Sequence, residues 1–214
     1  MKKRRRGFIF ILAFAAAVCS GCIKQEEESS SMRSVVYLYP RDALEVSIQL
    51  NGSSLEDACT YPRYKEGWHV IARPDGSLTN LDDGQEYDCL FREENVEETF
   101  DMEEGFLVKG EETAAFLQET FTGLGLIPEE YNTLLVWYLP QMEENPWNLI
   151  MFRMEIGRGS TSLAVLPEPD RVFRVIMAYQ ALEKPVNVRE PKLEELAPSR
   201  NGFTAIEFGA LELS

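Results

Sequence analysis

The clearest pattern of hydrophobic and polar positions lies at 44–50, where every second residue from Leu44 to Leu50 is apolar. This period of two predicts a β-strand with one buried and one solvent-facing side. The same alternation predicts strands at 150–156, 173–179 and 204–208. Turn sequences separate the early strands and favour antiparallel pairing; they lie at Asn51-Gly52, Pro74-Asp75-Gly76 and Asp82-Asp83-Gly84.

Between the early and late strands, the apolar positions follow a helical period. Leu117, Phe121 and Leu124 recur at i, i+4 and i+7. A second apolar stripe begins after Pro128 and is expected to end at Pro140. The order of strands, two helices and strands predicts an α+β fold: a mostly antiparallel β-sheet or sandwich with a two-helix insertion near 111–139.

The N-terminal segment has the arrangement of an export signal. Five consecutive basic residues at 2–6 precede an 11-residue apolar run from Phe8 to Val18. Such a run is shorter than the roughly 20 residues that a membrane-spanning helix needs. Ser20-Gly21-Cys22 follows and resembles the lipobox of bacterial lipoproteins, although Cys19 stands where that motif usually has an aliphatic residue. An ordinary secretory signal and an uncleaved anchor are the alternatives.

The lipobox resemblance implies that the Cys22 sulfur receives a diacylglycerol, so that acyl chains such as palmitate tether the chain to the membrane. We therefore expect a lipoprotein signal peptide at 1–21, a flexible acidic tether at 22–34 and a single α+β domain at 35–214. Within that domain, 35–92 is a candidate β-rich subdomain and 105–210 a candidate α+β subdomain. The expected location is the extracytoplasmic face of the cell membrane.

Removal of the signal makes the chain strongly acidic. Residues 1–21 hold five of the 21 basic residues and none of the 36 acidic residues, which leaves a net charge of −20 for 22–214. Such a charge argues against nucleic acid as a partner, because phosphate binding needs a basic surface. The expected partners are the membrane, through the Cys22 anchor, and an unidentified envelope ligand or protein. From Glu93 to Glu104, seven of 12 residues are acidic, which predicts a solvated loop.

Cys59 and Cys89 are the cysteines that remain outside the signal. In an exported domain, an even pair is a candidate disulfide, here closing a 31-residue loop. Two free thiols are the alternative. His69 is the only histidine, and we therefore expect no multi-ligand zinc site, no other metal site and no cofactor.

The stretch after the second predicted helix is the best candidate binding segment. Its carboxylate, carboxamide and indole side chains are the groups that bind sugar hydroxyls or cations. They are Gln141, Glu143, Glu144, Asn145, Trp147 and Asn148. The alternative is a structural turn, in which Asn145-Pro146 sets the bend and Asn148 caps it.

Several motifs resemble an uncharacterised family of exported bacterial proteins that share the pattern VIYLYP, TYP, PDG and YWLPQMExNPxN. The matching segments here are Val35–Pro40, Thr60–Pro62 with the downstream Trp68, Pro74–Gly76 and Leu139–Glu143. A local departure is Val136-Trp137-Tyr138. The family has no known activity, so the resemblance implies a defined domain of about 35–208 and no mechanism.

We expect a membrane-tethered envelope lipoprotein that acts as a binding or interaction module, with a glycan or wall component as the favoured ligand. Two alternatives remain. One is an acid-dependent hydrolase that uses paired carboxylates, although 36 acidic residues make some such pair inevitable. The other is a purely structural envelope protein. The catalytic residues, if any, are not identified by the sequence.

The lipid anchor can be tested directly. Wild-type protein is expected in the membrane fraction, with a mass that includes the acyl chains. Cys22→Ser is expected in the soluble fraction, because it removes the sulfur that carries the lipid. Cell fractionation with intact-mass spectrometry measures both outcomes, and an unmodified, freely soluble wild-type protein would contradict the anchor.

Overall fold

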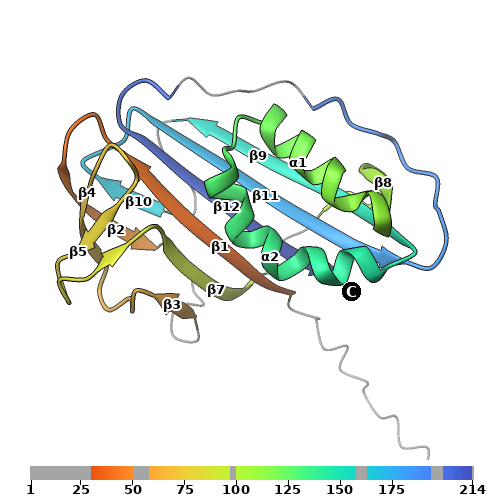
Figure 1. Ribbon diagram of the computed structural model, residues 1–214, viewed down its shortest axis with the longest axis horizontal. Coiled ribbons are helices and arrows are strands. Elements are labelled where there is room, and N and C mark those ends of the chain that lie inside the picture. The colour runs from red at the N-terminus through yellow and green to blue at the C-terminus, as the bar shows by residue number, and fades with distance from the viewer. Residues whose placement is uncertain (1–29, 51–57, 97–99, 158–162, 194–199, 214) are drawn as a thin grey trace, which may run out of the picture.

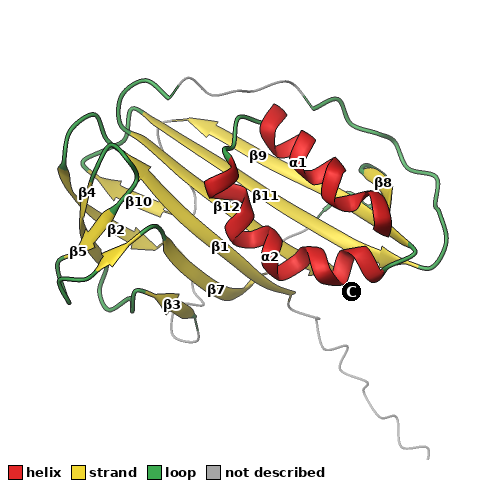
Figure 2. Cartoon of the chain, viewed as in Figure 1, coloured by secondary structure: helices red, strands yellow, loops and turns green. Residues whose placement is uncertain are grey.

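A computed structural model of the protein describes residues 30–50, 58–96, 100–157, 163–193 and 200–213. Cys22 and the expected signal lie outside these residues. Within them, the α+β prediction is confirmed: mostly antiparallel sheets are combined with two helices (Figures 1 and 2). Neither helix in the described part of the chain is long and apolar enough to span a membrane.

The strands form two sheets, one of seven strands in the order β3-β7-β1-β12-β11-β9-β8 and one of five in the order β10-β2-β4-β5-β6. Neighbouring strands are antiparallel except for β11 and β12, which are parallel. The strands of the large sheet are β1 (Ser30–Tyr39), β3 (Cys59–Tyr61), β7 (Leu90–Val96), β8 (Phe106–Lys109), β9 (Trp147–Gly157), β11 (Arg171–Leu182) and β12 (Thr204–Leu213). Those of the small sheet are β2 (Leu44–Leu50), β4 (Trp68–Ala72), β5 (Leu78–Asn80), β6 (Glu86–Tyr87) and β10 (Leu163–Leu166).

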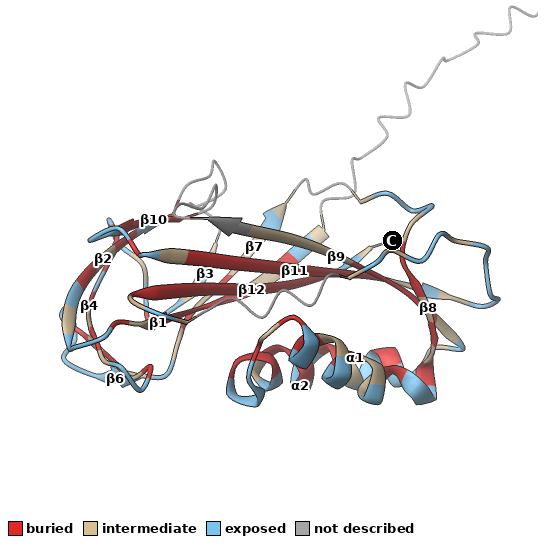
Figure 3. Cartoon of the chain, turned by 90° about the horizontal axis from the view of Figure 1, so that it is seen from above, coloured by how far each residue is buried: buried red, intermediate tan, exposed pale blue. Residues whose placement is uncertain are grey.

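The two helices, α1 (Thr113–Gly123) and α2 (Pro128–Glu144), cover one face of the large sheet (Figure 3). Their buried residues Leu117, Phe121 and Leu134 pack with Val175 and Phe208 of the sheet. The small sheet packs against the opposite face at one end, where Val36 and Leu38 of β1 join its apolar side. Strands from both candidate subdomains therefore pair within one large sheet.

Helix α2 continues past Pro140 instead of ending there, which corrects the predicted boundary. The last turns are retained because Met142 is fully buried in the core between helix and sheet. Proline removes one backbone hydrogen bond to the carbonyl group four residues earlier. Here that residue is Val136, whose side chain is 65 % exposed, so water can solvate the free carbonyl group.

Two segments expected to be solvated belong to the large sheet. Strand β1 begins at Ser30 within the predicted tether, and its Met32 and Ser34 are buried between β7 and β12. Strand β7 extends into the acidic stretch because Glu93 pairs with Arg33 at 3.2 Å. Residues 97–99 of that stretch lie outside the described residues.

Of the two alternatives for Cys59 and Cys89, the structure has the free thiols and not the candidate disulfide. Cys59 lies opposite Glu93 in the pairing of β3 with β7, and Cys89 comes four residues before Glu93. Four residues of extended chain span about 13 Å, whereas bridged cysteines need Cα atoms within about 7 Å. Burial raises the pKa of the Cys89 thiol to about 11.

Gly110 is required where the chain enters α1. A Cβ atom at this position would lie 2.6 Å from the carbonyl oxygen of Glu143 and closer still to that of Asn145. We expect Gly110→Ala to destabilise the protein by about 2–4 kcal/mol, because backbone at the end of α2 would have to move. Urea denaturation measures this loss.

Gly123→Ala is the matched control. No atom lies within 4 Å of a Cβ atom at this helical position, and alanine favours a helix by up to about 1 kcal/mol over glycine. The control should leave stability unchanged or raise it slightly. Equal stability of the Gly110→Ala variant and the wild type would contradict the tight contact with α2.

Candidate functional site

The six residues of the candidate segment 141–148 do not converge on one pocket. Glu143 and Glu144 lie on the last turn of α2 with exposed side chains. Trp147 opens β9, and its ring lies near the ammonium group of Lys109 at 5.9 Å. Gln141 faces a different surface, where its amide oxygen accepts a hydrogen bond from the Tyr179 hydroxyl at 3.4 Å.

The two asparagines of this segment make contacts that hold the turn together. The fully buried Asn148 donates from Nδ2 to the carbonyl oxygen of Met142 at 2.8 Å and to Thr113 Oγ1 at 3.0 Å. Its Oδ1 accepts from Asn145 Nδ2 at 2.8 Å. These bonds join the end of α2 to the start of α1, and they fit the interpretation of the segment as a structural turn. Both the nitrogen and the oxygen of the Asn148 amide are used in them.

A nucleophilic centre built on a serine and the histidine finds little support among the described residues. Ser47 and His69 are hydrogen-bonded at 3.0 Å, but they form an exposed cross-strand pair on the small sheet. No carboxylate of a described residue is bonded to His69, and nucleophilic catalysis needs a base that is itself oriented by a third group. In the same part of the chain, no three His, Cys, Asp or Glu side chains come together as a metal site.

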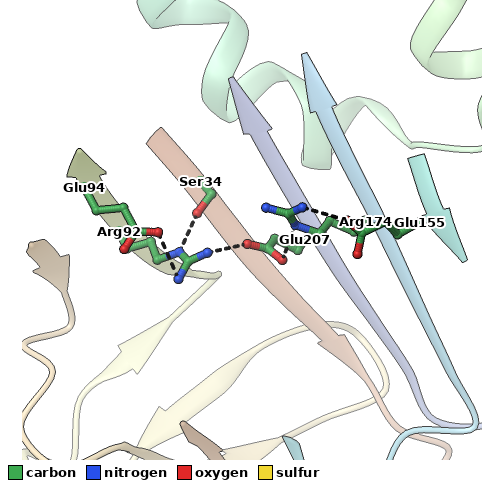
Figure 4. Close-up of polar contacts among 6 residues, drawn as sticks. All are labelled: Ser34, Arg92, Glu94, Glu155, Arg174 and Glu207. Atoms are coloured by element: carbon green, nitrogen blue, oxygen red, sulfur yellow. Dashed lines mark hydrogen bonds and ion pairs between the residues drawn. The ribbon is translucent and has the colours of Figure 1, made fainter. Parts of the chain in front are cut away.

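A buried row of charged side chains crosses the large sheet on the face opposite the helices (Figure 4). At its centre, the two Glu207 oxygens each accept from one arginine: Arg92 Nη2 at 2.8 Å and Arg174 Nε at 3.1 Å. Arg92 also donates to Ser34 Oγ at 3.0 Å. The row, called the ionic row below, ends at two further carboxylates, Glu94 beside Arg92 and Glu155 beside Arg174.

The burial and pairing of the ionic row indicate a structural role. Glu207 and Ser34 are fully buried, and Arg92 and Arg174 are 1 % and 4 % exposed. Both Glu207 oxygens are occupied by guanidinium groups, so the carboxylate has no free face for a substrate. Charged side chains are rarely buried unless they are paired in this way.

A candidate ligand site among the described residues is a groove where β1 ends, here called the Tyr39–Arg200 groove. Its volume is about 770 Å³, within the range of about 300–1,000 Å³ usual for small-molecule sites. It lies where segments far apart in the sequence meet. The lining residues are Tyr39, Pro40, Arg41, Pro74, Ile127, Arg200, Asn201 and Gly202.

Two motifs of the family resemblance build one wall of this groove. Tyr39-Pro40 closes the first motif, and Pro74 opens the Pro-Asp-Gly turn between β4 and β5. Gly76 of that turn has φ +88°, and a Cβ atom there would lie 2.8 Å from the Tyr39 ring. Glycine is therefore needed both for the left-handed backbone and for the close approach of the turn to β1.

Arg200 fixes the opposite wall by holding the start of α2. Its guanidinium group forms a two-pronged ion pair with Glu130, with distances of 2.5 and 2.8 Å, and donates to the carbonyl oxygen of Gly125 at 2.6 Å. It also lies over the Tyr39 ring at 5.6 Å. Glu130 in turn accepts from the backbone N–H of Ile127 at 2.9 Å, which caps the helix.

These contacts also set the charges in the groove. Burial, followed by the nearby Glu130 carboxylate, raises the pKa of Tyr39 well above its ordinary value, so its hydroxyl stays neutral. The hydrogen bond to Glu130 raises the pKa of Arg200 further. Arg41 is exposed and forms no ion pair with a described residue.

A second groove, of about 450 Å³, lies at the other end of β1 and includes Gln141. Its arginine is neutralised, because Arg33 pairs with Glu93 at 3.2 Å and lies over the Trp137 and Tyr138 rings. Glu212 adds a further carboxylate to its lining. Gln141 is thus the one residue of the candidate segment that lines a described groove.

Comparison with known proteins finds no match for the chain, whether among protein-family models, curated proteins or solved structures.

The ionic row yields a stability prediction. Glu207→Gln removes the charge that Arg92 and Arg174 share, and loss of one partner from a buried ion pair typically costs about 3–5 kcal/mol. We expect a loss of that size in the free energy of unfolding, measured in urea. Glu119→Gln, at an exposed position of α1, should change stability by less than about 0.5 kcal/mol. Equal effects of the two substitutions would contradict the structural role.

Proposed function

We propose that the protein is a lipid-anchored binding module on the extracytoplasmic face of the membrane, and that it binds a cell-wall component in the Tyr39–Arg200 groove. The observation that carries the proposal is this groove, whose walls are held by the Glu130–Arg200 pair and the Gly76–Tyr39 contact. Rigid walls lower the ordering cost of binding. The export signal and Cys22 support the location.

The position of the groove along β1 supports the same function. Ser30 is eight positions after Cys22, and eight steps of fully extended chain span at most about 29 Å. An anchor at Cys22 therefore keeps the Ser30 end of β1 near the bilayer. Tyr39 is at the opposite end of this ten-residue strand (Figure 1), roughly 30 Å away, so the groove can face the wall.

The alternative of a purely structural envelope protein differs from this proposal in that no ligand would bind in the groove. The alternative of a hydrolase with paired carboxylates would use the second groove, which Glu93 and Glu212 both line, although Glu93 is already paired with Arg33 at 3.2 Å. An unidentified protein partner is also compatible with the anchor. A substitution that fills the groove distinguishes wall binding from these alternatives.

The test compares two tryptophan substitutions, one at the residue that precedes α2 and one within α2. Ile127, at the N-cap, is 38 % exposed and lines the groove, whereas Val136, within the helix, is 65 % exposed and lies outside the groove. Full-length protein, extracted from membranes in detergent, is incubated with purified cell-wall sacculi and sedimented. We expect wild type and Val136→Trp to sediment with the wall. The amount of Ile127→Trp that sediments should be at least about sixfold lower than that of wild type, because the indole fills the groove.

Two results would overturn the proposal. One is a wild-type protein that stays in the supernatant at every wall concentration. The other is an Ile127→Trp variant that binds as well as Val136→Trp. Thermal unfolding of both variants provides the folding control, and similar midpoints are expected because both substitutions replace exposed side chains.

A further inference from the structure

The lining of the Tyr39–Arg200 groove differs in charge from the rest of the protein. The chain has 36 acidic and 21 basic residues, yet the groove is lined by two arginines and no acidic residue. Two carboxylates contact this lining. Glu130 is fully buried against Arg200, and Asp170 lies against Gly202 and accepts from the backbone N–H of Phe203 at 2.8 Å. Both are bonded within the protein, so the unpaired charge in the lining is that of Arg41, which favours a negatively charged ligand.

The two arginines have different roles. Arg200 is already engaged within the protein, since Glu130 and the Gly125 carbonyl group accept hydrogen bonds from its two terminal nitrogens and the Tyr39 ring centroid lies 5.6 Å from its Cζ. Its charge is balanced by Glu130. Arg41 is exposed and has no ion pair with a described residue, so its guanidinium group is available to a ligand.

This free guanidinium group stands beside apolar surface. Pro40, Pro74 and Ile127 line the same groove and offer ring and methyl surfaces on which the apolar face of a sugar can lie. Arginine binds carboxylate and phosphate groups through two parallel hydrogen bonds, a geometry that lysine does not provide. The groove thus combines one anion-binding group with apolar lining residues.

We infer that the ligand is an anionic sugar of the cell wall, whose carboxylate or phosphate group binds Arg41 while its ring lies against Pro40, Pro74 and Ile127. This inference rests on the proposed function and adds the chemical class of the ligand. Arg41 acts as the specificity-determining residue, and Arg200 positions the groove. A neutral sugar lacks the group that Arg41 recognises.

Two matched pairs of sugars test the inference by isothermal titration of the full-length protein in detergent. N-acetylmuramic acid and N-acetylglucosamine differ by a carboxylate-bearing substituent, and glucose 6-phosphate and glucose differ by a phosphate group. We expect at least one anionic sugar to bind about tenfold or more tightly than its neutral partner. Whichever pair shows the preference identifies the anion. The preference should weaken as salt is raised, because ions screen exposed charges.

Variants assign the preference to Arg41. Arg41→Ala should abolish it, and Arg41→Lys should restore it only in part. Arg63→Ala is the control, because Arg63 is an exposed arginine outside the groove, and it should bind like the wild type.

Equal affinities within both pairs, no binding of any of the four sugars, or an unchanged preference in Arg41→Ala would each overturn the anion inference. The proposed function would still stand if Ile127→Trp abolished wall binding, and it would fall with the inference if that substitution had no effect. The two experiments therefore separate failure of the ligand class from failure of the site.

Discussion

The alternation of side chains along β1 is the constraint on which the rest of the structure depends. Val35 and Tyr37 enter the core under the helices, and Val36 and Leu38 enter the core under the small sheet. A shift of one residue would exchange these two sets, so burial on both faces fixes the register. The Tyr37 hydroxyl reinforces it by donating to Thr133 Oγ1 of α2 at 2.8 Å. The same register places Tyr39 at the end of the strand, where the groove is built.

The ionic row fixes how β7, β1, β12 and β11 lie beside one another. Its Arg92–Glu207–Arg174 arrangement requires three strands to present charged side chains at matching levels on one face. Such a row is not needed for stability alone, because burying charges is costly and apolar residues often serve as well. We interpret it as a device for specificity, since any other strand order would leave Glu207 buried without a partner. It also separates the two apolar clusters on that face of the sheet.

The sequence allowed the α+β class, the two helices and the main strands to be predicted, because their burial follows local periods of two or 3.6 residues. Features that depend on distant partners were missed. Ser34 is buried because Arg92, 58 residues away in sequence, donates to it, and nothing local distinguishes Ser30–Ser34 from a polar tether. The pairing of Arg200 with Glu130 spans 70 residues. Conversely, the segment 141–148 has the composition of a binding site, but its two asparagines form hydrogen bonds within the turn.

With the proposed anchor at Cys22, β1 would run from a membrane-proximal end to the Tyr39–Arg200 groove, in which we propose wall recognition. The most direct test is a crystal structure of the protein soaked with the anionic sugar that binds best in solution. The account predicts density for the sugar in the Tyr39–Arg200 groove, with its anionic group within hydrogen-bonding distance of Arg41. Density at the second groove beside Gln141, or a groove left unoccupied at saturating sugar, would contradict it.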